Sequence, residues 1–281
     1  MEKKLHIEKN TIQETLVIPL YARKLCTELY PFLFKDEQAD DIIKQLDYDF
    51  DSLKDKFSGV VQKFGSLEIA VRQYDVRQEL FDYILEHPHC SVVNLGCGLD
   101  QSAEAMDNGF IKMYNIDMPD VIQVRNEILP PKERVKNISC DLNDIRWFDE
   151  VEKQDGVIFF GTGVFYYFKK EEIEHLFNAM AMAFPGGRLV FDICGLKGCK
   201  MMMKNFVKEA GITDVEAYFH VDHLNIDIAS WLRHAKVSQK PYMYGYHDLN
   251  DKSISWLFHK IAKFGDKNFK MTITRIDFDE A

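Results

Sequence analysis

The sequence predicts an α/β protein with a doubly wound, mostly parallel sheet and an antiparallel terminal strand. From Cys90 onward, short apolar strands alternate with helical segments, which is typical of a parallel sheet covered by helices on both faces. A glycine-rich turn follows the first of these strands, at the edge where such sheets bind ligands. Residues 1–85 instead carry helical patterns and are expected to form an N-terminal helical cap.

Three helical stretches are expected in this cap. Thr11–Leu33 has apolar residues at three- and four-residue spacing and is interrupted by Pro19. Asp36 opens a second stretch, whose acidic first turn suits a helix N-terminus. Ser66–Glu86 is a third and longer amphipathic run. The cap and the sheet are expected to form one compact unit.

Residues 86–281 are expected to form the sheet domain. Five strands are expected in the segments SVVNL, GFIKMYNID, RVKNISCD, DGVIFFG and GRLVFDIC, with helices such as DVIQVRNEIL and EEIEHLFNAMAMAF between them. Toward the end, VEAYFHV and FKMTITRIDF read as further strands, and helices are expected near 228–234 and 254–264. A lid-like insertion is expected around residues 220–250.

Composition narrows the class of protein. The 281 residues suffice for one large domain with additions, and 46% of them are hydrophobic. A net charge of -10, from 35 Lys and Arg against 45 Asp and Glu, repels phosphate backbones. We therefore expect a small-molecule partner and no nucleic acid. No run of about 18 apolar residues occurs, the polar first residues lead us to expect no signal peptide, and the six cysteines are scattered. These features indicate a cytoplasmic protein that does not bind membranes.

The strongest local signal is the segment Val92–Gly98, in which an apolar strand runs into a Gly-x-Gly turn and then a helix. Glycines there let the backbone approach a ligand closely, although a simple tight turn has the same pattern. The dinucleotide fingerprint has a third glycine where this chain has Gln101. Together with an acid at the end of the next strand, this pattern suits an adenosyl ligand that carries no phosphates.

Acidic residues end the next two expected strands. Asp117 lies where a carboxylate can bridge both ribose hydroxyls; it could also cap the helix that begins after Met118, instead of or together with that role. Asp141 can accept a hydrogen bond from an adenine amino group while Leu142 packs on the ring, or it could lie in a solvated turn. Residues 161–168 follow the fourth strand. All four segments should converge on one crevice, because ligands of open α/β sheets bind at the carboxyl ends of strands.

These residues resemble the leucine carboxyl methyltransferase-like family of class I methyltransferases, which depend on S-adenosylmethionine and include bacterial tetracenomycin-type polyketide O-methyltransferases. The resemblance runs from about Glu14 toward the end of the chain and weakens after Leu196. The matching residues are Glu14–Leu16, Ile18–Arg23, Asp47–Phe50, Arg72, Asp75, Asn94–Asp100, Ile116–Ile122 and Gly163–Phe168.

The resemblance implies S-adenosylmethionine as cofactor and a Rossmann-like methyltransferase fold. Arg72 would hold the carboxylate of the methionyl part, because a planar guanidinium pairs bidentately with a carboxylate; an ion pair between Arg72 and Asp75 is the alternative. Gly96 and Gly98 would lie under the methionyl and ribose portions. The other cofactor-binding positions that the resemblance implies are Asp117, Met118, Asp141, Leu142 and Gly163.

The chain also departs from the family pattern. Thr162 stands where the family usually has Glu, and Gln101 and Ser102 stand where Asp100 is commonly followed by Thr-Arg. The first change removes a carboxylate near the methionyl amine and the acceptor. The cofactor therefore carries over from the resemblance, whereas the leucine-carboxyl substrate does not.

We expect the chain to methylate a carboxylate or hydroxyl of a small, polyketide-like acceptor. The sulfonium already activates the methyl group, so the protein chiefly positions the reactants in a dry pocket. A phenol, with an ordinary pKa of about 10, would benefit from a base, whereas a carboxylate needs none. Asp192, His220 and His223 are candidate bases that also fit structural roles, so no catalytic residue is assigned.

Two other functions remain open. A nicotinamide-dependent oxidoreductase shares the strand, Gly-x-Gly and helix start, although the missing third glycine argues against it. A catalytically inactive protein that binds S-adenosylmethionine is the other, because Thr162 could mark lost catalysis. Neither His220-x-Asp222-His223 nor His87-Pro88-His89 has further ligands at recognised spacing, so no metal is expected.

Further expectations concern the walls of the acceptor pocket and the packing of helices around the sheet. Phe165–Phe168 are expected partly in the core and partly as walls of such a pocket, while Met201–Met203 are expected to pack a helix against the sheet. The N-terminal helices, rich in apolar and aromatic residues, are expected to close over the acceptor together with residues 220–246.

Overall fold

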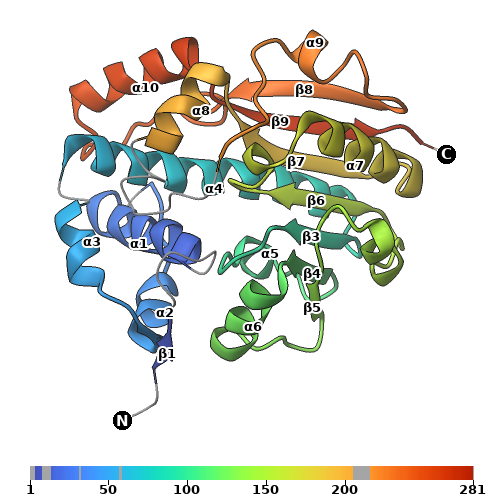
Figure 1. Cartoon of the computed structure of the whole chain (residues 1–281), viewed down its shortest axis with the longest axis horizontal. Coiled ribbons are helices and arrows are strands. Elements are labelled where there is room, and N and C mark those ends of the chain that lie inside the picture. Colours follow the sequence, from blue (N-terminus) through green and yellow to red (C-terminus); the bar gives the residue numbers. More distant parts are fainter. Residues whose placement is uncertain (1–3, 8–13, 32, 57–58, 205–215, 281) are drawn as a thin grey trace.

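A seven-stranded sheet forms the centre of the molecule (Figure 1). The computed structural model describes residues 4–7, 14–31, 33–56, 59–204 and 216–280. The strand order is β5-β4-β3-β6-β7-β9-β8. The strands are β3 (Ser91–Leu95), β4 (Lys112–Asp117), β5 (Val135–Ser139), β6 (Val157–Gly161), β7 (Arg188–Ile193), β8 (Ala235–Pro241) and β9 (Thr272–Phe278).

The five strands from β3 to β7 are parallel, and β9 runs antiparallel to both of its neighbours, β7 and β8. Every residue of β3, β6 and β7 is buried, because helices cover both faces of the sheet and leave no strand face for water. The predicted fold class, with its antiparallel terminal strand, is confirmed.

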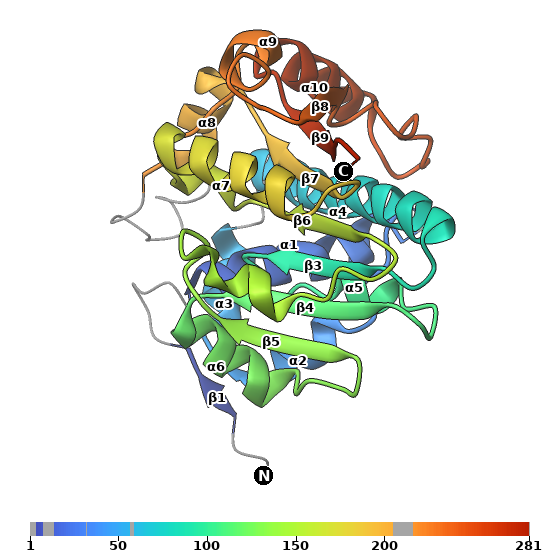
Figure 2. The same ribbon diagram turned by 90° about the vertical axis from the view of Figure 1, so that its right-hand side faces the viewer.

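Helices pack on the two faces of the sheet as separate layers (Figure 2). One face carries α4 and α10 with α5, and the other carries α7 with α8 and the short helix η1. The helices of the sheet domain are α5 (Ser102–Ala105), α6 (Pro119–Ile128), η1 (Ile145–Glu150), η2 (Phe165–Tyr167), α7 (Lys170–Ala183), α8 (Leu196–Met202), α9 (Leu224–Asp227) and α10 (Trp256–Asn268).

The N-terminal part consists of α1 (Glu14–Leu29), α2 (Ala39–Gln45), α3 (Phe50–Lys56) and α4 (Val60–Glu86), with a parallel strand pair that was not expected, β1 (Leu5–His6) and β2 (Leu46–Asp47). Cys26 and Tyr30 pack against α4, while Leu16 and Leu20 pack in another cluster with α6. The first helix thus joins the N-terminal part to two sides of the sheet domain. Residues 11–13 and 32 of the expected helix lie outside the described residues.

Two expectations near the end of the chain are wrong. Residues 216–221 of the expected strand VEAYFHV do not join the sheet, because the backbone N–H groups of Tyr218 and Phe219 donate to the Tyr166 carbonyl, at 2.7 and 3.2 Å; residue 215 lies outside the described residues. The helix expected near 228–234 is a series of turns that follows the short α9.

The edge strand β8 was missed within the same region, in the segment 220–250 that was expected to form a lid-like insertion. Its sequence AKVSQKP is mostly polar, and none of its residues is fully buried. An edge strand with lysines along it satisfies the sheet without an apolar run, and such lysines discourage pairing with another chain. A search for apolar strands therefore passes over it.

None of the helices in the described ranges has the length and apolar character that crossing a bilayer requires.

Candidate functional site

A cavity of about 510 Å³ lies at the carboxyl ends of β3, β4, β6 and β7, under the N-terminal half of α4 and the start of α1. All eight residues that were predicted from the sequence to bind the cofactor line this cavity, although they are spread over more than ninety positions of the chain. They are Arg72, Gly96, Gly98, Asp117, Met118, Asp141, Leu142 and Gly163.

The glycine turn after β3 needs glycine for two separate reasons. Gly96 and Gly98 have φ angles of +62° and +47°, in the left-handed region that other residues rarely adopt. A Cβ at position 96 would also lie 2.5 Å from Cγ2 of Val164, and one at position 98 would lie 3.1 Å from Cδ2 of Leu16. The turn is therefore held against both the β6 loop and α1.

Asp117 lies at the end of β4, facing the glycine turn. Its carboxylate accepts hydrogen bonds from the backbone N–H groups of Gly98 and Met118, each at 2.8 Å. Burial raises the pKa of Asp117, and these two hydrogen bonds oppose the rise. The alternative role as a helix cap is wrong, because the N-cap of α6 is Met118 and no side chain caps that helix.

Asp141 and Leu142 follow β5 at the far end of the cavity. Leu142 is buried, and its carbonyl accepts from the indole N–H of Trp147 at 3.2 Å, which fixes the turn. Asp141 is exposed and accepts from the backbone N–H of Asn143 at 2.9 Å. An apolar wall with an acceptor at its edge is the arrangement that a purine with an exocyclic amine would fit.

Arg72 projects from α4 to the loop after β6. Its guanidinium pairs with Asp192 of β7 at 3.1 Å, while Asp192 also accepts from the Gly163 N–H at 2.6 Å and the Tyr166 hydroxyl at 3.1 Å. Burial acts to lower the pKa of Arg72, but the Asp192 carboxylate and nearby tyrosines outweigh it and raise it. The expected alternative, a pair between Arg72 and Asp75, is wrong, since Asp75 lies 3.3 Å from His247.

A buried polar network supports the glycine turn, and sequence reasoning missed it. Asp100, which follows the turn, accepts from Arg23 at 3.3 Å and from the amide of Gln73 at 2.7 Å. Arg125 of α6 donates to the carbonyls of Gly98 and Asp100 at 2.9 and 2.8 Å. Arg23 and Asp100 both lie within segments that resemble the family, but nothing local in the sequence indicates that they pair across 77 positions.

The end of the cavity away from Asp141 is lined mainly by apolar and aromatic side chains. Phe165 is fully buried in the core, whereas Tyr166, Tyr167 and Phe168 line the cavity. Met201 and Met202 were expected to pack a helix against the sheet, and both line the cavity. The N-terminal helices contribute Ile18, Gly65 and Ile69 to the wall, the loop after β8 contributes Tyr242, and Met271 lines it just before β9. Glu68, one turn of α4 before Arg72, lines the cavity as well.

Comparison with known proteins fits this geometry. The leucine carboxyl methyltransferase profile matches residues 18–181, more than half of the chain, from α1 through α7. The chain belongs to the leucine carboxyl methyltransferase family.

A curated relative is TcmP, the tetracenomycin polyketide synthesis O-methyltransferase of Streptomyces glaucescens. The two proteins are 25% identical over 182 residues, which make up 64% of this chain and 65% of TcmP. The match therefore leaves more than a third of TcmP uncovered.

Solved structures share the fold at low sequence identity. A DUF574 family protein from Streptomyces avermitilis has a TM-score of 0.56 and 8% identity, with coverage of 92% of this chain and 97% of that chain. The plantazolicin methyltransferase BamL, in complex with a triazolic desmethylPZN analog and SAH, has a TM-score of 0.52 and 13% identity, with coverage of 96% and 100%. These likenesses show the methyltransferase fold.

The position where the family usually has Glu is Thr162, which lines the cavity. Of the three candidate bases, only Asp192 lines the cavity, and it is already bonded to Arg72, Gly163 and Tyr166. His220 is 3.8 Å from Asp222, away from the cavity. Among the described residues no group of three or more His, Cys, Asp or Glu could hold a metal ion.

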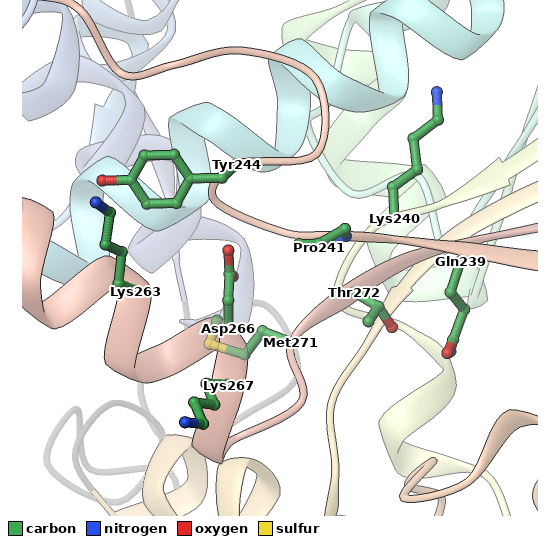
Figure 3. Close-up of a pocket in the computed structure, with 9 residues that line it drawn as sticks. All are labelled: Gln239, Lys240, Pro241, Tyr244, Lys263, Asp266, Lys267, Met271 and Thr272. Carbon is green, nitrogen blue, oxygen red and sulfur yellow. The ribbon is translucent and has the colours of Figure 1, made fainter.

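A second hollow, of about 560 Å³, lies between β8, β9 and α10 on the outside of the same region (Figure 3). Lys240, Lys263 and Lys267 line it but point apart from one another. Asp266 lies at its floor and accepts from the Met243 N–H at 3.0 Å. Met271 lines both this hollow and the main cavity, and the charge of Asp266 acts on Glu68 of the main cavity by raising its pKa.

Proposed function

We propose that this protein binds S-adenosylmethionine and transfers its methyl group to an oxygen, a carboxylate or a hydroxyl, of a small acceptor. The observation that carries the proposal is the convergence of the eight nominated residues on one cavity at the carboxyl edge of the sheet. Membership of the leucine carboxyl methyltransferase family and the name of TcmP point the same way.

The cavity fits the adenosyl part of this cofactor. Its volume of about 510 Å³ lies in the range of roughly 300–1,000 Å³ that small-molecule sites span. Each oxygen of Asp117 accepts one backbone N–H, and an ionised carboxylate has about four acceptor positions. Lone pairs therefore remain for two ribose hydroxyls. Leu142 offers an apolar face for the adenine and Asp141 an acceptor for its amine.

Arg72 would hold the methionyl carboxylate. Its guanidinium has five N–H donors, and Nη1 donates to Asp192, while Nε has no partner among the described residues. Asp192 fixes the plane of the guanidinium and leaves the other donors for a ligand. Because the pKa of Arg72 is raised, the side chain is charged at neutral pH.

When bound, the cofactor supplies a methyl group already activated on a sulfonium. The chain has to exclude water and orient the acceptor toward that group. Ile18 from α1, Met201 and Met202 from α8, and Tyr242 from the loop after β8 line the cavity. Their apolar surfaces suit an acceptor with an apolar body. On this basis we propose that the N-terminal cap (residues 1–85) and the segment around 220–250 cover the acceptor.

Binding of the cofactor is tested by titrating the protein with adenosylhomocysteine in a calorimeter. We expect micromolar affinity and, at 100 times the dissociation constant, a gain in unfolding free energy of about 2.7 kcal/mol. NADH and NADPH should give neither heat nor a thermal shift. A thermal shift with a nicotinamide cofactor and none with adenosylhomocysteine would favour the nicotinamide-dependent oxidoreductase instead.

The transfer step is tested with labelled S-adenosylmethionine and a panel of carboxylic acids and phenols. Label should move to an oxygen of at least one acceptor. Binding of adenosylhomocysteine with no transfer across the panel would favour the inactive binding protein instead.

A further inference from the structure

Glu68 is a buried carboxylate that has no role in the cofactor site as proposed so far. It lies on α4, is 8% exposed and lines the cavity. No group among the described residues forms a hydrogen bond or an ion pair with its carboxylate. A buried carboxylate without a partner is costly, and one that faces a cavity can be partnered by a ligand.

The other carboxylates that line the cavity are already engaged. Asp100 accepts from Arg23 and Gln73, and Asp192 accepts from Arg72. The remaining two also have protein donors, since Asp117 binds two backbone N–H groups and Asp141 binds one. Within the part of the chain that the structure describes, Glu68 is therefore the one carboxylate of the cavity that is free for a cation or another donor.

The position of Glu68 relates it to Arg72. The two residues are four apart in α4, so they lie on the same face, about 6 Å apart along the helix axis. Both line the cavity. An amino-acid head group carries its ammonium and its carboxylate on one carbon atom, so a ligand whose carboxylate binds Arg72 brings an ammonium to this part of the cavity.

We propose that Glu68 binds the α-ammonium of the methionyl group, so that Glu68 and Arg72 together hold both charges of that group. This assignment rests on the proposed function, because it needs the cofactor in the cavity. It also accounts for Thr162: a chain with a threonine after β6 can take the carboxylate for the amine from α4 instead.

The surroundings of Glu68 set how it would respond to an ammonium. Burial, followed by repulsion from Asp266 on α10, raises the pKa of Glu68 to about 8, while Arg72 opposes the rise. The Tyr242 hydroxyl beside it is neutral, because burial raises its pKa well above the usual value. Without ligand, Glu68 is therefore mostly protonated at pH 7. A bound ammonium stabilises the carboxylate, so the carboxyl proton leaves to the buffer and the ammonium keeps its protons.

Proton release gives a test that does not depend on catalysis. Adenosylhomocysteine is titrated at pH 7 into the full chain in phosphate, HEPES and Tris, whose ionisation enthalpies differ. The wild type should release close to one proton per ligand bound. Glu68→Gln, which keeps the shape and removes the charge, should release none and bind about 10- to 100-fold more weakly, the scale of a lost charged hydrogen bond.

Two controls separate the possible failures. Glu86→Gln removes the same charge from the exposed end of the same helix and should behave as wild type. 5′-Methylthioadenosine lacks the amino-acid head and should bind wild type and Glu68→Gln equally.

Each contrary outcome has one meaning. If wild type binds neither ligand, the proposed function fails. If wild type binds both, and Glu68→Gln keeps its affinity and proton release with adenosylhomocysteine, Glu68 does not hold the ammonium. Equal weakening of both ligands would also overturn the assignment, because the amino-acid head would then not be what Glu68 recognises.

Discussion

The two ends of the cavity are built in different ways. The end at Gly96, Asp117 and Asp141 consists of turns that directly follow strands, and it presents backbone N–H groups and carboxylates. The opposite end gathers side chains such as Ile18 and Met201 from helices far apart in the sequence. The first end is specified by local residue patterns, whereas the second exists only once the helices have packed. We therefore expect substitutions at the first end to change cofactor binding and those at the second to change the acceptor.

Arg72 lies between the two ends of the cavity, and its removal should cause the largest loss of unfolding free energy and of cofactor affinity. Arg72→Ala leaves Asp192 buried without its cation, and breaking a buried pair from one side costs about 3–5 kcal/mol of unfolding free energy. Affinity for adenosylhomocysteine should fall by a further 1.5–3 kcal/mol, approximately. Chemical denaturation and calorimetry measure the two effects. Arg146→Ala, at a side chain that is 86% exposed, should change neither; wild-type affinity in Arg72→Ala would remove Arg72 from the cofactor site.

Gly96→Ala tests whether the backbone turn is as demanding as its geometry indicates. The added Cβ would lie 2.5 Å from Cγ2 of Val164, and the alanine would have to adopt the φ of +62° that Gly96 has. We therefore expect a loss of about 2–3 kcal/mol of unfolding free energy together with weaker cofactor binding. Gly109→Ala is the matched control, because its φ is +89° and nothing lies within 4 Å of the added atom. Its loss of unfolding free energy should therefore come only from the strained φ angle of the backbone. Similar losses in the two variants would mean that the Val164 contact is unimportant.

The pH dependence of stability isolates Glu68. Its pKa is raised in the folded protein, to about 8, so its protonated form stabilises the fold below the unfolded-state pKa of about 4.3, and this stability is lost as pH rises through 8. Between pH 6 and 8 the unfolding free energy of the ligand-free wild type should therefore fall relative to Glu68→Gln, by about 2 kcal/mol. Denaturant titrations at each pH measure the difference. Parallel curves for the two proteins would show that Glu68 is not protonated in the folded state.

Asp117→Asn probes the charge of one carboxylate while preserving its shape. The amide oxygen can accept only one of the two backbone N–H groups, and it binds ribose hydroxyls less strongly than a carboxylate does. We expect roughly tenfold weaker binding of adenosylhomocysteine, about 1.4 kcal/mol, and the same change for 5′-methylthioadenosine, since both carry the ribose. A loss confined to adenosylhomocysteine would place Asp117 at the amino-acid head instead.

Ile18→Ala should have the smallest effect on the cofactor and so sharpens the contrast between the two ends. Ile18 is partly buried in α1 and lines the cavity. Affinity for adenosylhomocysteine should stay within about 0.5 kcal/mol of wild type, while KM for an acceptor found in the panel should rise. A large loss of cofactor affinity would show that the two ends are not separable.

The same contrast explains what could be predicted from sequence. β6 and β7 are mostly apolar runs, and the turn between Gly96 and Gly98 is a local pattern, so the sheet and the adenosyl end were predictable. The pair between Arg72 and Asp192 spans 120 positions, and no local sequence pattern near either residue indicates it. Glu68 looks like any glutamate on an amphipathic helix, and only its spacing from Arg72 could have indicated it.

The place of β9 in the sheet has a consequence for how the chain is made. β8 pairs with β9 alone, and β9 also completes the pairing of β7. Until residues 272–278 emerge from the ribosome, β7 has an open backbone edge and β8 has no partner at all. Unpaired edges of this kind are templates for pairing with other chains, and chains longer than about 150 residues commonly fold through such intermediates. A chain shortened before β9 would present two open strands at once.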